Sequence, residues 1–315
     1  MANEAVKLEQ FNIFEKQFPK VIIVGNGISL SCLNKEHAIN GATGIIESAA
    51  KENHCKYSPD DIKELPFPLQ YLVVAKDDKK FKTIKDLGKK LSGEMFYEEA
   101  DWHVARQMTL LDADAILTTN YSYELERSLD KDFLKHRNKY AKFTEMTVNK
   151  GRREGKYQIH SFYQFENVTE KPIRIWHIHG EAYNPSSIVL GHDMYGNLLS
   201  RYKEEITLCN NRYKRSTRTN SIRPYSWIDY FIFGNVYIIG FSVSENEYDL
   251  WWLLNRKKQE KLPHGNTYYF DRYVGNGRKR MLFDALDVKE VITGCDDYKD
   301  HYTESLSRIK NGELQ

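Results

Sequence analysis

Short apolar runs, each followed at once by small or polar residues, constrain the fold of this 315-residue chain more than any other feature. The runs are VIIVGNGIS (21–29), DAILTT (114–119), PIRIWHIHG (172–180), NVYIIGFSVS (235–244), NTYYFDRY (266–273) and VKEVITG (288–294). Continuous β-branched and apolar stretches, without polar alternation, are typical of strands buried on both faces of a parallel sheet. The sequence therefore predicts a sheet of at least six such strands.

Helical patterns lie between several of these runs. The segment ENEYDLWWLLNRKKQE (245–260) carries acids early and bases late, as the helix dipole favours, and the segments 278–287 and 297–310 are further candidates. Alternation of strands and helices predicts an α/β fold: a Rossmann-like parallel sheet with helices on both faces. We expect one domain over residues 1–315.

Two regions depart from this alternation. Residues 35–112 are polar, charged and mostly helical in pattern, and we expect them to form a helical insertion that caps the sheet. Residues 139–165 contain two strand-like segments around the turn NKGRREG, which predicts a β-hairpin insertion before the third core strand.

Composition excludes several classes of protein. The net charge of +2, from 46 basic and 44 acidic residues, provides no general case for nucleic-acid binding. The longest near-apolar stretch, 230–241, is too short to span a bilayer, and the charged N-terminus is no secretory signal. The four cysteines lack zinc-knuckle spacing and are typical of reduced thiols. We expect a soluble, cytoplasmic protein without membrane contact or metal.

The first and fourth runs end in glycine turns. These turns contain Gly25, Asn26, Gly27 and Ser29 after the first run, and Gly240, Phe241 and Ser242 after the fourth. Glycines let a backbone approach a pyrophosphate, and ligands of open parallel sheets bind at the carboxyl ends of strands. The third glycine of the dinucleotide fingerprint is missing, so an ordinary strand-to-helix turn remains an alternative at the first site.

The second run ends in Thr118, Thr119, Asn120 and Tyr121. A helix N-cap needs one threonine or asparagine, and three in succession exceed that need. The cluster therefore favours a binding or catalytic turn over a simple cap.

The third run ends in His177, Ile178, His179 and Gly180. In an extended strand both histidines would point to the same face. No cysteine or carboxylate accompanies them at ligand spacing, so zinc binding is not predicted. Each histidine could also be an ordinary buried side chain, and Gly180 leaves the ring of His179 unscreened at the sheet edge.

Together, these four segments resemble the core of the sirtuin family in order and rough spacing, over residues from about 20 to 295. They are most similar to bacterial sirtuin-like proteins of anti-phage defence, including those of the abortive-infection AbiH type. The shared segments are IVGNG, TTNY, HIHG followed by IVLG (188–191), and GFS followed by an acidic helix. The IVLG segment could be an edge strand or a tight turn.

The resemblance implies a Rossmann-like fold that binds NAD. In the defence members it implies cleavage of NAD to nicotinamide and ADP-ribose, which depletes NAD in the infected cell. It implies that Asn120 and His179 are catalytic, and that the remaining residues of the four turns bind NAD: Gly25, Asn26, Gly27, Ser29, Thr118, Thr119, Tyr121, Gly180, Gly240, Phe241 and Ser242. Ser122 stands where the family commonly has an aspartate.

Cleavage of the nicotinamide–ribose bond passes through an oxocarbenium-like state, much as glycoside hydrolysis does. Asn120 could bind a ribose hydroxyl and position the attacking water, while His179 could accept a proton. His177 is expected to be structural or to support the site from behind.

Two other functions stay open. The chain could bind NAD or ADP-ribose as a silent sensor, although a binding site would not need both Asn120 and His179. It could also be an NAD-dependent deacylase, although it lacks the two cysteine pairs that hold zinc in those enzymes. An active NADase must be restrained in its host, so we expect control by homo-oligomerisation or by a partner defence protein.

Overall fold

The computed structural model describes residues 5–33, 41–52, 55–75, 82–93, 97–145, 156–166, 168–216, 221–275 and 277–314. In these residues nine strands form one sheet in the order β1-β4-β5-β6-β3-β2-β7-β8-β9. The strands are β1 (Ala5–Val6), β2 (Lys20–Val24), β3 (Ala115–Thr118), β4 (Ala141–Thr144), β5 (Ser161–Phe165), β6 (Ile173–His177), β7 (Asn235–Ile239), β8 (Thr267–Asp271) and β9 (Val288–Ile292).

The six strands expected from the sequence form the parallel part of the sheet, β6-β3-β2-β7-β8-β9. Every residue of β3 and β6 is buried, and so are Val21–Val24 of β2, because helices cover both faces of these central strands. The edge strand β9 contains both buried and more exposed residues. The mixed α/β class, with an open and mostly parallel sheet, agrees with the prediction.

The strand order contains a reversal that matters for ligand binding. The chain proceeds from β2 to β3 and β6 on one side, then returns to β7 on the other side of β2. In open α/β sheets, ligands bind at the carboxyl ends of the strands where the order reverses. The ends of β2 and β7 therefore form the expected crevice.

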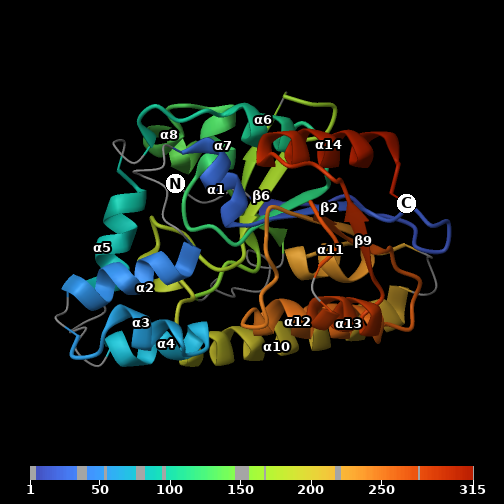
Figure 1. The fold of residues 1–315 in the computed structure, drawn as a ribbon. Helices are drawn as coiled ribbons and strands as arrows, with labels where there is room; N and C mark the ends of the chain where they lie inside the picture. The colour runs from blue at the N-terminus through green and yellow to red at the C-terminus, as the bar shows by residue number, and fades with distance from the viewer. Residues whose placement is uncertain are drawn as a thin grey trace.

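Helices pack on both faces of the sheet (Figure 1). One face carries α1 (Asn26–Cys32), α6 (His103–Thr109), α7 (Glu124–Leu129), α8 (Phe133–Tyr140) and α14 (Tyr298–Asn311); the other carries α10 (His192–Ser216), α11 (Trp227–Phe233), α12 (Tyr248–Lys258) and α13 (Gly277–Ala285). No helix within the described ranges combines the length and apolarity that crossing a bilayer requires.

The region from 139 to 165 joins the sheet. Residues 139–140 end α8, and β4 pairs antiparallel with β5, which pairs antiparallel with β6. The two strand-like segments thus extend the sheet at the β6 side, and the two-residue β1 adds to β4 in parallel. The turn NKGRREG lies outside the described residues.

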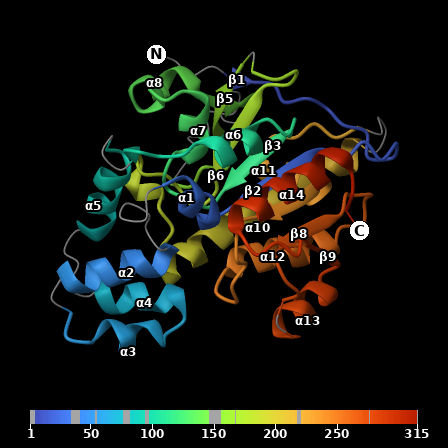
Figure 2. The same ribbon diagram turned by 45° about the horizontal axis from the view of Figure 1, so that its top comes forward.

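The region from 35 to 112 is helical where it is described. Besides α6 it contains α2 (Gly41–Glu52), α3 (Pro59–Lys63), α4 (Phe67–Ala75) and α5 (Lys82–Leu91). Figure 2 shows α2, α3 and α4 packed together beside one end of the sheet. Helix α4 contacts α10, and α5 contacts the short 3₁₀ helix η3 (Pro185–Ser187), so this helical group borders the carboxyl edge of the strands.

Candidate functional site

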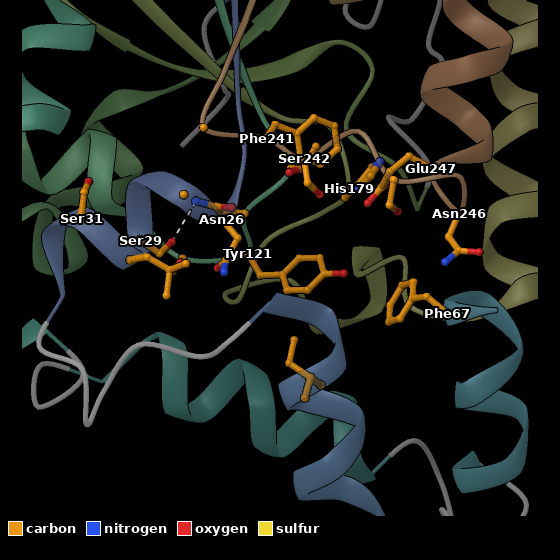
Figure 3. Close-up of a pocket in the computed structure, with 18 of the residues that line it drawn as sticks. Asn26, Ser29, Ser31, Phe67, Tyr121, His179, Phe241, Ser242, Asn246 and Glu247 are labelled. Atoms are coloured by element: carbon orange, nitrogen blue, oxygen red, sulfur yellow. Dashed lines mark hydrogen bonds between the residues drawn. The ribbon is translucent and has the colours of Figure 1, made fainter. Parts of the chain in front are cut away.

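A cavity of about 780 Å³ runs along the carboxyl ends of the parallel strands. Most of the residues expected to bind or cleave NAD line it: Asn26, Gly27, Ser29, Thr119, Asn120, Tyr121, His179, Gly240, Phe241 and Ser242. Figure 3 shows Asn26 and Ser29 toward one side of this space, and Phe67 and Asn246 toward the other. Segments more than 200 residues apart in sequence therefore meet at one cavity.

The two glycine turns are locked to each other. The Gly27 N–H donates to the Gly240 carbonyl oxygen at 2.8 Å. A Cβ on Gly27 would lie 2.6 Å from that oxygen and 2.3 Å from the Tyr302 hydroxyl, and a Cβ on Gly25 would lie 2.4 Å from the Phe241 ring. Both glycines are thus required by protein packing. The Gly27 N–H, expected to face a phosphate, is instead used within the fold.

Asn120 is held from three sides. Its Nδ2 donates to the Gly25 carbonyl oxygen at 3.2 Å and to Ser29 Oγ at 2.9 Å. Its backbone N–H donates to Thr118 Oγ1 at 3.0 Å, which accounts for a threonine at the end of β3. Both amide hydrogens are engaged, so Oδ1 remains as the group that can accept a hydrogen bond from a ligand.

His177 braces the Asn120 turn from behind and does not line the cavity. The ring is 1% exposed, with Nδ1 2.8 Å from the Asn120 carbonyl oxygen and Nε2 2.9 Å from Glu126 Oε1. Burial alone would lower the pKa of this imidazole, but Glu126 and these acceptors raise it to about 9. Both ring nitrogens face acceptors, so the imidazolium fits this position and the neutral ring does not.

Ser122, at the position of the usual aspartate, donates to Glu124 Oε1 at 2.6 Å. Glu124 is buried, and burial raises the pKa of its carboxyl. A carboxylate therefore reaches this turn from two residues along the chain. This contact and the His177 brace together hold the loop in which the family commonly has an aspartate.

His179 forms a dyad with Asp249. Strand β6 ends at His177, so the two histidines do not share a face as an extended strand would place them. Instead His179 Nε2 lies 2.8 Å from Asp249 Oδ2 on the α12 side, and Tyr202 also donates to that oxygen at 3.3 Å. Burial opposes protonation of His179, but Asp249 and Glu247 raise the pKa of the imidazole above its ordinary value.

Gly180 allows this geometry. It has a φ of +91°, and a Cβ there would lie 2.3 Å from the Ser187 carbonyl oxygen. The following IVLG segment is irregular, with the Val189 N–H donating to the His179 carbonyl oxygen at 2.9 Å. This segment is therefore not a strand, and the turn holds His179 against the cavity.

The loop after β7 presents a further carboxyl group. Gly240 has a φ of +62° and Val243 a φ of +45°, a conformation that β-branched residues rarely adopt. Such strain persists only where the surrounding structure enforces it, and it occurs most often near functional sites. The loop leads into Glu247, which lines the cavity beside His179 (Figure 3).

His179, Glu247 and Asp249 each offer one ligand atom, and these atoms lie within 4.8 Å of one another. Three such groups could converge on a cation in principle. Ligand atoms around a four-coordinate ion lie roughly 3.3 Å apart, given bonds of about 2.0 Å. The 2.8 Å separation of His179 Nε2 and Asp249 Oδ2 is that of a hydrogen bond, so proton transfer suits this cluster better.

The opposite end of the cavity is charged and aromatic. Asp271 ends β8 and Arg272 follows it, Lys279 lies in α13, and Tyr298 and Tyr302 belong to α14. The Arg272 guanidinium stacks over the Tyr298 ring at 3.8 Å. This end provides both signs of charge and flat surfaces for a ligand.

Sequence reasoning missed the carboxylates of Glu247 and Asp249. They were interpreted only as acids that suit the first turn of a helix, and 70 residues separate Asp249 from His179. The available signal was their position directly after the Gly240 turn, because a segment that leaves a strand end passes along the ligand crevice. Asp249 is 1% exposed, which an ordinary helix acid on the surface would not be.

Comparison with known families agrees with the sequence motifs. Residues 13–264 match the family described as Bacteriophage abortive infection AbiH. No curated protein matches the chain. The matched segment includes all four motif-bearing turns and most of the sheet. The chain belongs to the AbiH family of bacteriophage abortive infection proteins.

Proposed function

We propose that the protein hydrolyses NAD at the nicotinamide–ribose bond and releases nicotinamide and ADP-ribose. One observation carries the proposal: Asn120 and His179, from different strand ends, line the same cavity where the strand order reverses. Each is buried, and each is held by hydrogen bonds that leave another of its polar atoms for a ligand. A chain that needed only a packed core would have no reason to collect these groups here.

The cavity suits an extended dinucleotide. Its volume of about 780 Å³ lies within the range of about 300–1,000 Å³ that is usual for ligand cavities. Its lining includes aromatic side chains, among them Phe67 of α4 and Tyr298 of α14, together with polar groups such as Asn120 and His179. A ligand with two ring systems joined by a polar linker suits such a lining.

Cleavage of the nicotinamide–ribose bond needs little help from a general acid. Nicotinamide in NAD is cationic and leaves as a neutral base, taking the electrons of the C1′–N bond with it. Asn120 Oδ1 accepts a hydrogen bond from a ribose hydroxyl or from the attacking water, and its fixed amide keeps that acceptor in place. His179 contacts the same ribose and is oriented by Asp249. The reaction requires no metal.

Membership in an abortive infection family supports a role for NAD loss in anti-phage defence. Such an activity must be restrained before infection. We propose restraint through self-association or a partner defence protein, with NAD turnover that changes with protein concentration. Turnover per chain that stays constant over a thousandfold dilution would exclude control by self-association.

The test is product analysis with purified protein and NAD. We expect nicotinamide and ADP-ribose, with the rate reduced by about 10² or more in Asn120→Ala and in His179→Ala. Asn138→Ala and His103→Ala, at exposed positions, are matched controls and should retain activity. Binding without turnover would support the silent sensor, and nicotinamide release only with an acylated peptide would support a deacylase.

A further inference from the structure

Glu247 is a carboxyl group at the cavity wall that interacts with the Tyr195 hydroxyl, a contact that lowers its pKa but does not outweigh burial. It lies just before α12, and its ligand atom is within 4.8 Å of those of His179 and Asp249. Its Oε2 is buried and has no hydrogen-bond partner among the described residues. A buried carboxylate oxygen left unpaired is costly, so a group held this way at a cavity wall points to a ligand or to proton exchange.

The protonation states of the cluster favour Glu247 over His179 as the proton acceptor. Burial, with a contribution from Asp249, raises the pKa of Glu247 to about 7 although His179 opposes the change. The pKa of His179 is raised as well, which favours the imidazolium form. An imidazolium carries hydrogen on both nitrogens and cannot accept another proton.

Other titratable groups around Glu247 stay neutral. Tyr121 approaches from the turn after β3 and Tyr195 from α10, and burial raises the pKa of both phenols above the ordinary value. The Tyr121 hydroxyl donates to the Val189 carbonyl oxygen at 2.7 Å. The His179–Asp249 dyad therefore provides the charges that Glu247 meets.

We propose that Glu247 is the general base of the site and takes the proton of the water that attacks the ribose; this rests on the NAD hydrolase function proposed above. As the C1′–N bond breaks, its electron pair passes to nicotinamide. The water oxygen bonds to C1′, its proton passes to Glu247 Oε2, and the base later releases that proton to solvent. His179, held by Asp249, donates a hydrogen bond to the ribose instead of accepting the proton.

This assignment also stabilises the transition state. Ionised Glu247 places a negative charge in this cluster, beside the positive charge that develops on the ribose. Opposite charges in a buried site interact more strongly than in water. A site in which His179 acted as the base without Glu247 would lack this negative charge.

The experiment compares Glu247→Gln with Glu245→Gln, an exposed carboxyl on the same loop. Glu247→Gln should lower kcat by about 10²–10⁴. It should keep NAD binding and remove the acidic limb, centred near pH 7, from the pH–rate profile. Azide is a nucleophile that needs no base, so it should restore cleavage in Glu247→Gln and form 1-azido-ADP-ribose. It should not restore cleavage in His179→Ala, because the ribose contact is lost there.

A second measurement does not depend on turnover. Nuclear magnetic resonance titration of the His179 ring nitrogens should show a lower imidazole pKa in Glu247→Gln than in the unmodified protein, because one neighbouring carboxylate is gone. An unchanged pKa would overturn the proposal.

Two further outcomes would also overturn it. If the unmodified protein cleaves NAD and Glu247→Gln cleaves it equally well with the same pH profile, the base lies elsewhere while the NAD hydrolase function stands. One tightly bound divalent ion per chain, lost in Glu247→Gln, would assign the carboxyl to a metal. If the unmodified protein releases no nicotinamide at any concentration, both proposals fail together.

Discussion

The buried pair of His177 and Glu126 predicts a specific pH dependence of stability. Their side chains are each 1% exposed, and the pKa of the imidazole rises from 6.5 to about 9. A histidine whose pKa is raised on folding contributes stability that is complete below pH 6.5 and is lost as the pH rises through about 9. At about 1.4 kcal/mol per pH unit, the contribution is about 3 kcal/mol.

The perturbation is Glu126→Gln, which keeps the shape and removes the charge. The neutral amide can donate to His177 Nε2, so the ring no longer needs a second proton. In the unmodified protein, the free energy of unfolding should fall between pH 6.5 and about 9 as His177 loses its proton. In the variant this fall should be absent. The difference in stability between the two proteins should therefore shrink by up to about 3 kcal/mol over this window.

The assay is urea unfolding at pH 6, 7, 8, 9 and 10 for both proteins. The difference is compared because Lys257, whose pKa is lowered to about 7, adds stability with rising pH over the same range and cancels in the subtraction. Glu170→Gln, at an exposed carboxyl before β6, should change neither the slope nor the midpoint. A stability difference that stays constant from pH 6 to 10 would refute the charged state of His177.

The other predictions concern the site. Gly27→Ala should lower the free energy of unfolding by about 1–3 kcal/mol in urea denaturation, because its Cβ would meet the Gly240 backbone; full stability would mean that the turns are looser than described. The double variant with Asn120→Ala and His179→Ala should turn over NAD little more slowly than the slower of the two single variants, since both residues serve one step; a loss of rate equal to the product of the two single losses would indicate separate steps. A chelator should leave NAD turnover unchanged, and restoration of a chelator-treated protein by zinc would contradict the metal-free mechanism.

The parallel sheet could be predicted because its signals are local. Runs such as Val21–Val24 are apolar throughout, and only a strand covered on both faces accounts for them. The two-residue β1 carries no such pattern, since its pairing with β4 depends on the path of the chain. The long α10 was not predicted, because its polar composition in 192–216 resembles that of loops.

The candidate site was predictable only in part, because some of its contacts join residues that are far apart in the sequence. Asn120 and His179 stood out because they follow strands that point to one edge of the sheet. The partners of His179 come from α12, and no short-range pattern relates Asp249 to a residue 70 positions earlier. Gly27 lines the cavity, but the sequence did not indicate that its N–H donates to Gly240 or that its missing Cβ makes room for protein atoms.

The most direct test of the proposed hydrolase is mass spectrometry of NAD after incubation with the purified protein in oxygen-18 water. The account predicts equal amounts of nicotinamide and ADP-ribose, with one oxygen-18 atom at C1′ of the ADP-ribose. Asn120→Ala, with its acceptor removed, should form neither product at a comparable rate. Intact NAD at every protein concentration, or nicotinamide release without labelled ADP-ribose, would contradict hydrolysis at this site.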